Sequence, residues 1–286
     1  MTVNTRFLLR RADSHKGDYG HVLVVAGSIG LTGAPVLCAL AALRAGAGLV
    51  TVGVPESVYF IIASKLNEAM VYPLPESPAG TLSPHSVERL APLLARADVV
   101  ALGPGLSQEP PAMRAVQRLV AETELPVVLD ADGVNAFSGA ARRRLSKARV
   151  PVVITPHPGE MARLLGTTIQ AVQRSRLRIA AKTARELRAV VVLEGHRSVV
   201  ASATGRTYVN STGNPGMATA GMGDMLTGII AAFIGQGSDP FEAARAGVHL
   251  HGLAGDIAAR RVGQPSLIAS DLLAALPEAF KKAGAE

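Results

Sequence analysis

The chain has 286 residues and a formal net charge of +7, with 48% hydrophobic and 18% charged residues. Aromatic residues make up only 3% and tryptophan is absent, so the base-stacking surfaces of single-strand-binding proteins are scarce. No zinc-finger or basic-zipper spacing occurs, and we therefore expect no nucleic-acid partner and a positive surface that attracts nucleotides.

Short β-branched runs alternate with longer alanine-rich helical patterns, which is typical of a mainly parallel sheet covered by helices. The expected strands are, in chain order, His21–Ala26, Leu49–Val54, Asp98–Leu102, Pro126–Leu129, Val152–Ile154, Val190–Leu193, Ser198–Ala201 and Arg206–Val209. The expected helices are Ala34–Ala47, Pro84–Ala95, Pro111–Glu122, Gly159–Leu165, Ile169–Leu187, Asp224–Gly235 and Phe241–Arg260. Thr204 and Gly205 predict a hairpin turn, and the proline-rich segment Pro73–Pro84 predicts a loop.

The sequence predicts a single cytoplasmic domain that spans residues 1–286 and has no membrane partner. No linker, internal repeat or apolar stretch of about 18 residues interrupts the pattern, and Met1–Asp13 lacks the apolar core of a signal peptide. Cys38 is the only cysteine, which excludes an internal disulfide. Its apolar neighbours favour a buried position on a helix. Glycines and acidic residues gather where the expected strands end, which predicts one shared ligand cleft.

The densest motif is the glycine-rich segment Thr212–Asp224, which leads directly into an apolar helix. Free N–H groups and the positive dipole end of that helix would bind an anion, and Gly221 and Gly223 let a phosphate approach the backbone. Asp224 would accept a proton from an attacking hydroxyl. The alternative is that Asp224 is an ordinary N-cap after a glycine turn.

A second motif, Thr155–Glu160, follows an expected strand and opens a helix. His157 would contact a substrate phosphate or ring, and Glu160 would hold Mg²⁺ directly or through water. Alternatively, Glu160 only complements the positive end of the helix.

Three further turns follow expected strands. Asp130 and Asp132 suit either a hydrated Mg²⁺ or an ordinary turn, and Gly103–Leu106 brings backbone close to a ligand. The glycines of Gly27–Ala34 do not match a dinucleotide fingerprint, and no Walker lysine motif occurs. Two histidines of one helical pattern are expected to serve in packing or at an interface, His249 and His251.

In this order, the motifs resemble the ADP-dependent NAD(P)H-hydrate dehydratase family of the ribokinase-like superfamily. The resemblance runs from about Lys16 to Ala259 and depends most on Thr155–Glu160 together with Gly213–Thr219. It implies a ribokinase-like three-layer α/β sandwich. It also implies a repair enzyme that uses ADP and Mg²⁺ to return the S-form of hydrated NADH or NADPH (NADHX or NADPHX) to the reduced cofactor, releasing AMP and phosphate.

The resemblance also implies roles for particular residues. Hydrate-contacting positions would be Ala34, Gly105, His157 and Asp224, and Asp224 would be the catalytic base. The adenine-nucleotide side would comprise Glu194, Gly195, His196, Arg197, Ser198 and Gly223. One of these positions departs from the family pattern, because Glu194 stands where lysine is usual, and Met222 in the neighbouring glycine-aspartate motif also replaces a small hydroxyl residue. A homotetramer and a separate NAD(P)H-hydrate epimerase partner are further expectations, since the chain has no room for an epimerase domain.

Two alternatives stay open at this point. A ribokinase-like kinase of a vitamin or thiazole alcohol would share the anion hole and Asp224, although asparagine is more usual there where His157 stands. A catalytically idle adenine-nucleotide sensor would explain Glu194 and Met222.

Overall fold

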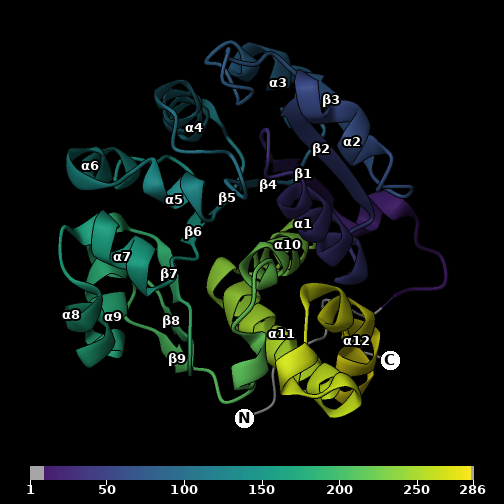
Figure 1. Ribbon diagram of the computed structural model, residues 1–286, viewed down its shortest axis with the longest axis vertical. Coiled ribbons are helices and arrows are strands. Elements are labelled where there is room, and N and C mark those ends of the chain that lie inside the picture. Colours follow the sequence, from purple (N-terminus) through teal and green to yellow (C-terminus); the bar gives the residue numbers. More distant parts are fainter. Residues whose placement is uncertain (1–9, 285–286) are drawn as a thin grey trace.

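The computed structural model describes residues 10–284. The first nine residues of Met1–Asp13, the segment that was predicted to lack a signal peptide, lie outside the described part. Nine strands form one sheet in the order β3-β2-β1-β4-β5-β6-β7-β8-β9 (Figure 1). The strands from β3 to β7 pair in parallel, whereas β7-β8 and β8-β9 are antiparallel. The expected α/β class with a mainly parallel sheet is therefore confirmed. No helix among residues 10–284 has the length and apolar character needed to cross a bilayer.

The strands are short and rich in valine, as expected for strands covered on both faces. Their bounds are β1 His21–Val25, β2 Leu49–Pro55, β3 Met70–Leu74, β4 Val99–Leu102, β5 Val127–Leu129, β6 Val152–Ile154, β7 Val190–Leu193, β8 Val199–Ala201 and β9 Thr207–Val209. The predicted hairpin joins β8 to β9, where Gly205 has a φ of 92° and its N–H donates to the Ser202 carbonyl.

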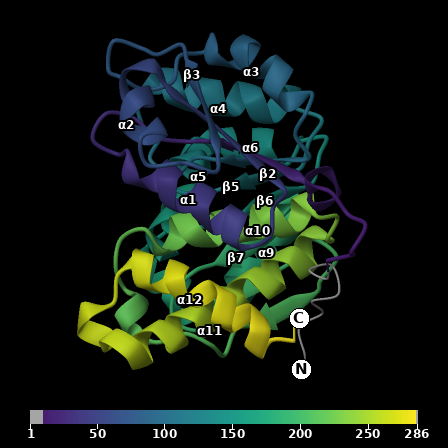
Figure 2. The same ribbon diagram turned by 90° about the vertical axis from the view of Figure 1, so that its right-hand side faces the viewer.

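Helices cover both faces of the sheet and make a three-layer sandwich (Figures 1 and 2). On one face lie α1 Gly33–Arg44, α2 Tyr59–Ala63, α10 Met222–Gly235, α11 Pro240–Val262 and α12 Ala269–Lys282. On the other lie α3 Ser86–Leu94, α4 Pro110–Glu122, α5 Asp132–Asn135, α6 Arg142–Leu145, α7 Pro158–Leu165, α8 Ile169–Arg174 and α9 Arg176–Leu187. Alternate residues of each central strand enter the two separate cores, as the two-residue period of a strand requires.

Helix α10 packs against α1 at the centre of the first face. A Cβ added at Gly228 would lie 2.1 Å from the Cys38 carbonyl oxygen, so the two helices can approach this closely only because residue 228 is glycine. Cys38 itself is fully buried, as predicted. This packing fixes α10 with its first turn near the carboxyl ends of the central strands.

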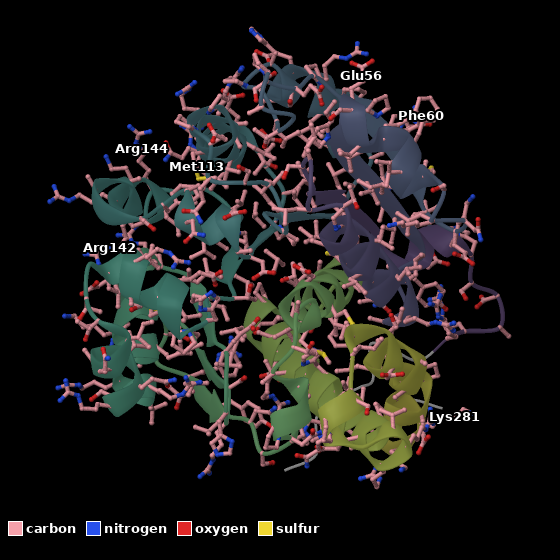
Figure 3. All side chains as sticks on the ribbon, viewed as in Figure 1. Glu56, Phe60, Met113, Arg142, Arg144 and Lys281 are labelled. Carbon is pink, nitrogen blue, oxygen red and sulfur yellow. The ribbon has the colours of Figure 1, made fainter. Side chains whose placement is uncertain are left out.

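Several elements differ from the sequence-based expectations. The chain forms β3, α2 and α12, which periodicity did not predict, and the expected helix Ile169–Leu187 is two helices that meet at Ser175. Ser175 has φ −142° and ψ 42°, which interrupts the helical backbone. The segment Pro73–Pro84 contributes its first two residues to β3 and is otherwise irregular, apart from an isolated bridge between Glu76 and Leu82. Two arginines of the basic run on α6, Arg142 and Arg144, lie at the periphery of the molecule (Figure 3).

Candidate active site

The glycine-rich motif leads into the first turn of α10, the helix end at which the sequence predicts anion binding. Gly221 is the N-cap and has a left-handed φ of 88°, and a side chain there would clash with Leu37 at 2.5 Å from its Cδ1 atom. Asp224 is therefore the third residue of the helix rather than its N-cap, which excludes the N-cap alternative. The free N–H groups of this turn and the helix dipole favour a negatively charged ligand beside Asp224.

Four acidic side chains surround this helix end and influence one another electrostatically. Asp130 follows β5, Glu160 lies on α7, Glu194 follows β7 and Asp224 lies on α10. Burial, followed by repulsion from Glu160, raises the pKa of Asp224 from 3.8 to about 6. Burial and the carboxylates of Asp224 and Glu160 raise the pKa of Asp130 to about 7. The pKa of Glu194 is raised well above its usual value by burial and by the other three carboxylates.

The two aspartates of the turn after β5 have different roles. Asp130 is only 5% exposed and accepts hydrogen bonds from the Ala131 N–H and the Thr155 hydroxyl, both at 2.8 Å from Oδ1. Asp132 instead accepts from the Ser107 N–H and from Asn135. Asp130 therefore belongs to the acidic cluster, and Asp132 stabilises the neighbouring turn.

His157 and Glu160 form a capping box at the start of α7. The Glu160 carboxylate accepts from the His157 N–H at 2.9 Å and lies 3.2 Å from His157 Nε2, while Nδ1 accepts from the Gly159 N–H. The hydrogen bond to Glu160 is the largest cause of the raised pKa of His157. Both oxygens of Glu160 are thus engaged in orienting His157, whose side chain is 52% exposed.

The structure brings together the other two predicted hydrate-contacting positions. Gly105 has a φ of 65°, and a Cβ added there would lie 3.2 Å from the Cβ of Ala34. The Ser28 hydroxyl donates to the Gly105 carbonyl and holds the turn after β4 against the turn after β1. No hydrogen bond in the described part of the chain joins either position to Asp224 or His157.

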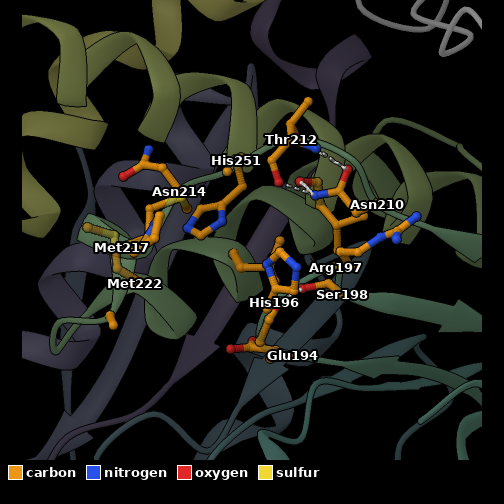
Figure 4. Close-up of a pocket in the computed structure, with 17 residues that line it drawn as sticks. Glu194, His196, Arg197, Ser198, Asn210, Thr212, Asn214, Met217, Met222 and His251 are labelled. Carbon is orange, nitrogen blue, oxygen red and sulfur yellow. Dashed lines mark hydrogen bonds between the residues drawn. The ribbon is translucent and has the colours of Figure 1, made fainter. Parts of the chain in front are cut away.

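The predicted nucleotide-side residues line a cavity of about 440 Å³ (Figure 4). Its walls include Glu194, Gly195, His196, Arg197 and Ser198, together with Met222 at the start of α10. The sixth predicted residue, Gly223, adjoins Glu194, since an added Cβ would lie 3.3 Å from Glu194 Oε2. The cavity is therefore continuous with the anion-binding end of α10.

Sequence reasoning missed several residues of this cavity. His251 had been assigned to packing or an interface, but the structure places it in the cavity wall with Asn210, Thr212 and Val248. Two glycines of α11 that follow His251 let another segment approach closely. A Cβ added at Gly252 would lie 2.3 Å from Thr212 Oγ1, and one added at Gly255 would lie 2.3 Å from Met217 Sδ. Glycines inside the helical pattern were the signal in the sequence that a loop packs against this face of α11.

Two charged residues outside the predicted set hold the walls of the cavity. Arg176 is half-buried, and its Nη2 donates to the carbonyls of Leu193 and Glu194 at 2.9 and 3.1 Å. Asp256 accepts from the Gly213 N–H at 2.9 Å and from the Asn214 amide at 3.0 Å. Both residues position backbone that borders the cavity.

The donor set fits a magnesium ion that is held mainly by water and a phosphate. No three His, Cys, Asp or Glu side chains within residues 10–284 converge as a closed metal site. Mg²⁺ in phosphoryl-transfer sites keeps several waters and uses only one or two carboxylates plus the phosphates of the substrate. The repulsion that raises the pKa values of Asp130, Glu194 and Asp224 would be relieved by a cation.

These features, a three-layer sandwich with a mostly parallel sheet and an anion-binding helix with a carboxylate in its first turn, define the ribokinase-like class of α/β proteins. Hydroxyethylthiazole kinase from Pyrococcus horikoshii shares this fold at 16% identity, with a TM-score of 0.61 over 93% of this chain and 92% of the kinase. The family model described as NAD(P)H-hydrate dehydratase matches residues 22–278. The chain belongs to this family.

Relatives at higher identity lie within the same family. The chain is 54% identical over 268 residues to the bifunctional NAD(P)H-hydrate repair enzyme Nnr of Moorella thermoacetica, covering 94% of the chain but 50% of that relative. It is 41% identical to the ADP-dependent (S)-NAD(P)H-hydrate dehydratase of Neisseria meningitidis, covering 94% and 86%. The ADP/ATP-dependent NAD(P)H-hydrate dehydratase of Bacillus subtilis, co-crystallized with ATP/Mg²⁺, superposes with a TM-score of 0.82 at 32% identity, covering 96% and 93%. The chain thus spans about half the length of the bifunctional relatives.

Proposed function

We propose that this protein dehydrates the S-form of hydrated NADH or NADPH at the expense of ADP, giving the reduced cofactor, AMP and phosphate. The observation that carries the proposal is the position of Asp224. It lies in the first turn of an anion-binding helix, among three other carboxyl groups and next to a cavity of nucleotide size. Family membership and the ADP-dependent relatives support this assignment.

The nucleotide would occupy the cavity bordered by Glu194–Ser198 and α11. Its terminal phosphoryl group would lie at the free N–H groups of α10, close to Gly223 and to the Glu194 carboxyl group that adjoins it. Preorganised N–H groups stabilise the charge that develops on the transferring phosphoryl group. The hydrated nicotinamide ring would approach from the side of Ala34, Gly105 and His157.

Asp224 would act as the general base on the C6 hydroxyl of the hydrate. A pKa of about 6 leaves its carboxylate mostly ionised near pH 7 while keeping it basic enough to accept a proton. The hydroxyl oxygen then bonds to the terminal phosphorus of ADP as the bond to AMP breaks. The C6–O bond next breaks with departure of phosphate, the ring nitrogen supplies electrons, and loss of a C5 proton restores the C5–C6 double bond.

When bound, Mg²⁺ would offset the negative charge of the phosphate groups. Asp130 and Glu194 are the carboxyl groups that would hold its water shell, because both oxygens of Glu160 already contact His157. Glu160 would contribute only through water. The co-crystallisation of the Bacillus subtilis relative with ATP/Mg²⁺ supports this use of the cation.

The test is an assay that mixes hydrated NADH with ADP and follows the return of dihydropyridine absorbance. Asp224→Asn is expected to lower turnover by about a hundredfold or more, the range for a lost general base. Binding of ADP should persist in this variant, which separates lost chemistry from lost binding. Near-normal turnover would remove Asp224 from the role. Turnover of a thiazole or vitamin alcohol in place of the hydrate would favour the kinase alternative.

We further propose a cytoplasmic homo-oligomer, expected to be a tetramer, that works together with an NAD(P)H-hydrate epimerase, as the resemblance implies. Two apolar side chains on α2 support self-association, since Phe60 is 80% and Ile61 is 48% exposed. Figure 3 shows Phe60 at the edge of the molecule. Light scattering of the purified chain would give the oligomeric state, and a monomer at assay concentration would refute this part of the proposal.

A further inference from the structure

His251 is a buried histidine that faces the cavity with an unused ring nitrogen. The residue is 8% exposed and lines the cavity from α11 (Figure 4). Its Nε2 atom is buried, and within residues 10–284 no group forms a hydrogen bond with it. Buried polar atoms of folded proteins are nearly always hydrogen-bonded, so an unpaired one in a ligand cavity indicates a ligand partner.

The chemistry of the ring decides what kind of partner it needs. Burial lowers the pKa of His251 to about 4, against a smaller opposing effect of a hydrogen bond to the Met222 backbone. The ring is therefore neutral at physiological pH and has one N–H donor and one acceptor nitrogen. Because Nε2 has no partner, we assign the hydrogen bond with the Met222 backbone to Nδ1, and this tautomer leaves Nε2 as the acceptor.

The surroundings of the ring suit the nucleoside part of a ligand better than its phosphates. His251 shares the cavity wall with the apolar residues Met217, Met222 and Val248 and with the uncharged residues Thr212 and Asn214. The positive charge of Arg197 comes from a different segment, the loop after β7 (Figure 4). A neutral acceptor nitrogen in apolar surroundings repels a phosphate oxygen, which is also an acceptor. It attracts an N–H or O–H donor.

We propose that His251 is a specificity-determining residue whose Nε2 accepts a hydrogen bond from a donor on the nucleoside of the bound adenine nucleotide. The inference rests on the proposed function only in taking an adenine nucleotide as the occupant of the cavity. Two groups of that nucleoside are donors, namely the exocyclic amine of adenine and the ribose hydroxyls. Their shared chemistry defines the site, and ligand analogues distinguish them.

The experiment measures the dissociation constants of ADP, IDP, 2′-deoxy-ADP and 3′-deoxy-ADP by calorimetry with the full chain. His251→Leu keeps the bulk but removes the acceptor, and it is expected to weaken ADP binding by about fivefold to tenfold, as for one neutral hydrogen bond. His251→Gln retains an acceptor oxygen and is expected to recover part of that loss. The matched control is His249→Leu, because His249 also has a buried unpaired ring nitrogen on α11 but does not line the cavity.

Comparing the affinities of the wild type and His251→Leu for ADP and for each analogue identifies the group that His251 binds. The analogue that lacks the partner of His251 should bind the wild type about fivefold to tenfold more weakly than ADP does, and it should bind His251→Leu no more weakly than it binds the wild type. IDP behaving this way identifies the exocyclic amine, and a deoxy analogue identifies a ribose hydroxyl. Equal ADP affinity of wild type and His251→Leu overturns the proposal, as does equal discrimination by both proteins against every analogue.

Two further measurements distinguish a failure of this inference from a variant that does not fold and from a failure of the proposed reaction. Thermal unfolding of each variant shows whether it folds, and if His251→Leu does not, equal affinity of the wild type for ADP and all three analogues overturns the proposal. ADP that binds with His251-dependent affinity while the hydrate is not dehydrated refutes the proposed reaction but supports this inference. Wild type that binds no adenine nucleotide overturns the inference together with the nucleotide part of the proposed function.

Discussion

Asp130→Asn is expected to make the protein more stable at pH 8 and to flatten the dependence of its stability on pH. Asp130 is 5% exposed, and burial is the largest cause that raises its pKa from 3.8 to about 7. The Ala131 N–H and the Thr155 hydroxyl both donate to Oδ1 of Asp130. An asparagine can keep both bonds through its own carbonyl oxygen while removing the charge.

Proton linkage gives the direction in which the stability of the wild type changes with pH. The folded state binds this proton more tightly than the unfolded state, so the stabilisation is complete below pH 3.8 and is lost as the pH rises to about 7. The difference between 3.8 and about 7, at about 1.4 kcal/mol for each pH unit, gives an upper limit of about 4 kcal/mol. Between pH 5 and pH 8 we expect a change of up to about 3 kcal/mol in the stability difference between variant and wild type.

The assay is urea unfolding at several pH values from 5 to 8, in the presence of a chelator so that no divalent cation screens the acidic cluster. The measured quantity is the free energy of unfolding of Asp130→Asn minus that of the wild type, which should rise with pH. Asp132→Asn is the matched control, because it removes a carboxylate of the same turn that bonds Ser107 and Asn135 and leaves Asp130 in place. A difference that stays constant from pH 5 to pH 8 would refute the reasoning.

Two further predictions concern the backbone around the site. Arg176→Met removes the donor to the carbonyls of Leu193 and Glu194 and is expected to raise the KM for ADP severalfold with little change in turnover. Steady-state kinetics would check this, with Arg178→Met as the control because Arg178 is exposed. Gly228→Ala forces a Cβ to 2.1 Å from the Cys38 carbonyl and is expected to destabilise the fold by about 1–3 kcal/mol or more, the usual cost of overpacking. Chemical unfolding beside Gly33→Ala, whose added Cβ meets nothing within 4 Å, would test it, and equal stability of the two variants would contradict the expected clash.

Local sequence patterns predicted the central fold well, because the parallel strands are valine-rich and bounded by glycine turns. The edge strand β3 escaped prediction, since Met70–Leu74 contains Pro73, which weakens a strand pattern. Pairing with β2 nevertheless makes it a strand, as an edge position tolerates proline. Helix α12 also contains a proline, Pro277, and its stability comes from packing its apolar side against α11, which no local pattern reveals.

The site was predictable only where a motif lies at a strand end or helix start. The turns containing Asp130, His157 and Asp224 fall in that category, because parallel strands bring their carboxyl ends to one edge. His251 and Arg176 lie inside helices, where sequence gives a helical face but not the loop that covers it. Their roles depend on contacts with distant segments, at Met222 for His251 and at Leu193 and Glu194 for Arg176.

Glu194, the acidic residue at the position where the family resemblance implies lysine, lies in the same surroundings. Glu194 adjoins the backbone of Gly223 at the positive end of α10, and its Oε1 is buried without a hydrogen-bond partner in the described part of the chain. Burial beside Asp130, Glu160 and Asp224 raises its pKa well above the usual value, so the folded protein binds a proton there more tightly than a free glutamate does. The positive end of the α10 dipole also favours a carboxyl group beside it, so the start of this helix accommodates an acidic residue at position 194.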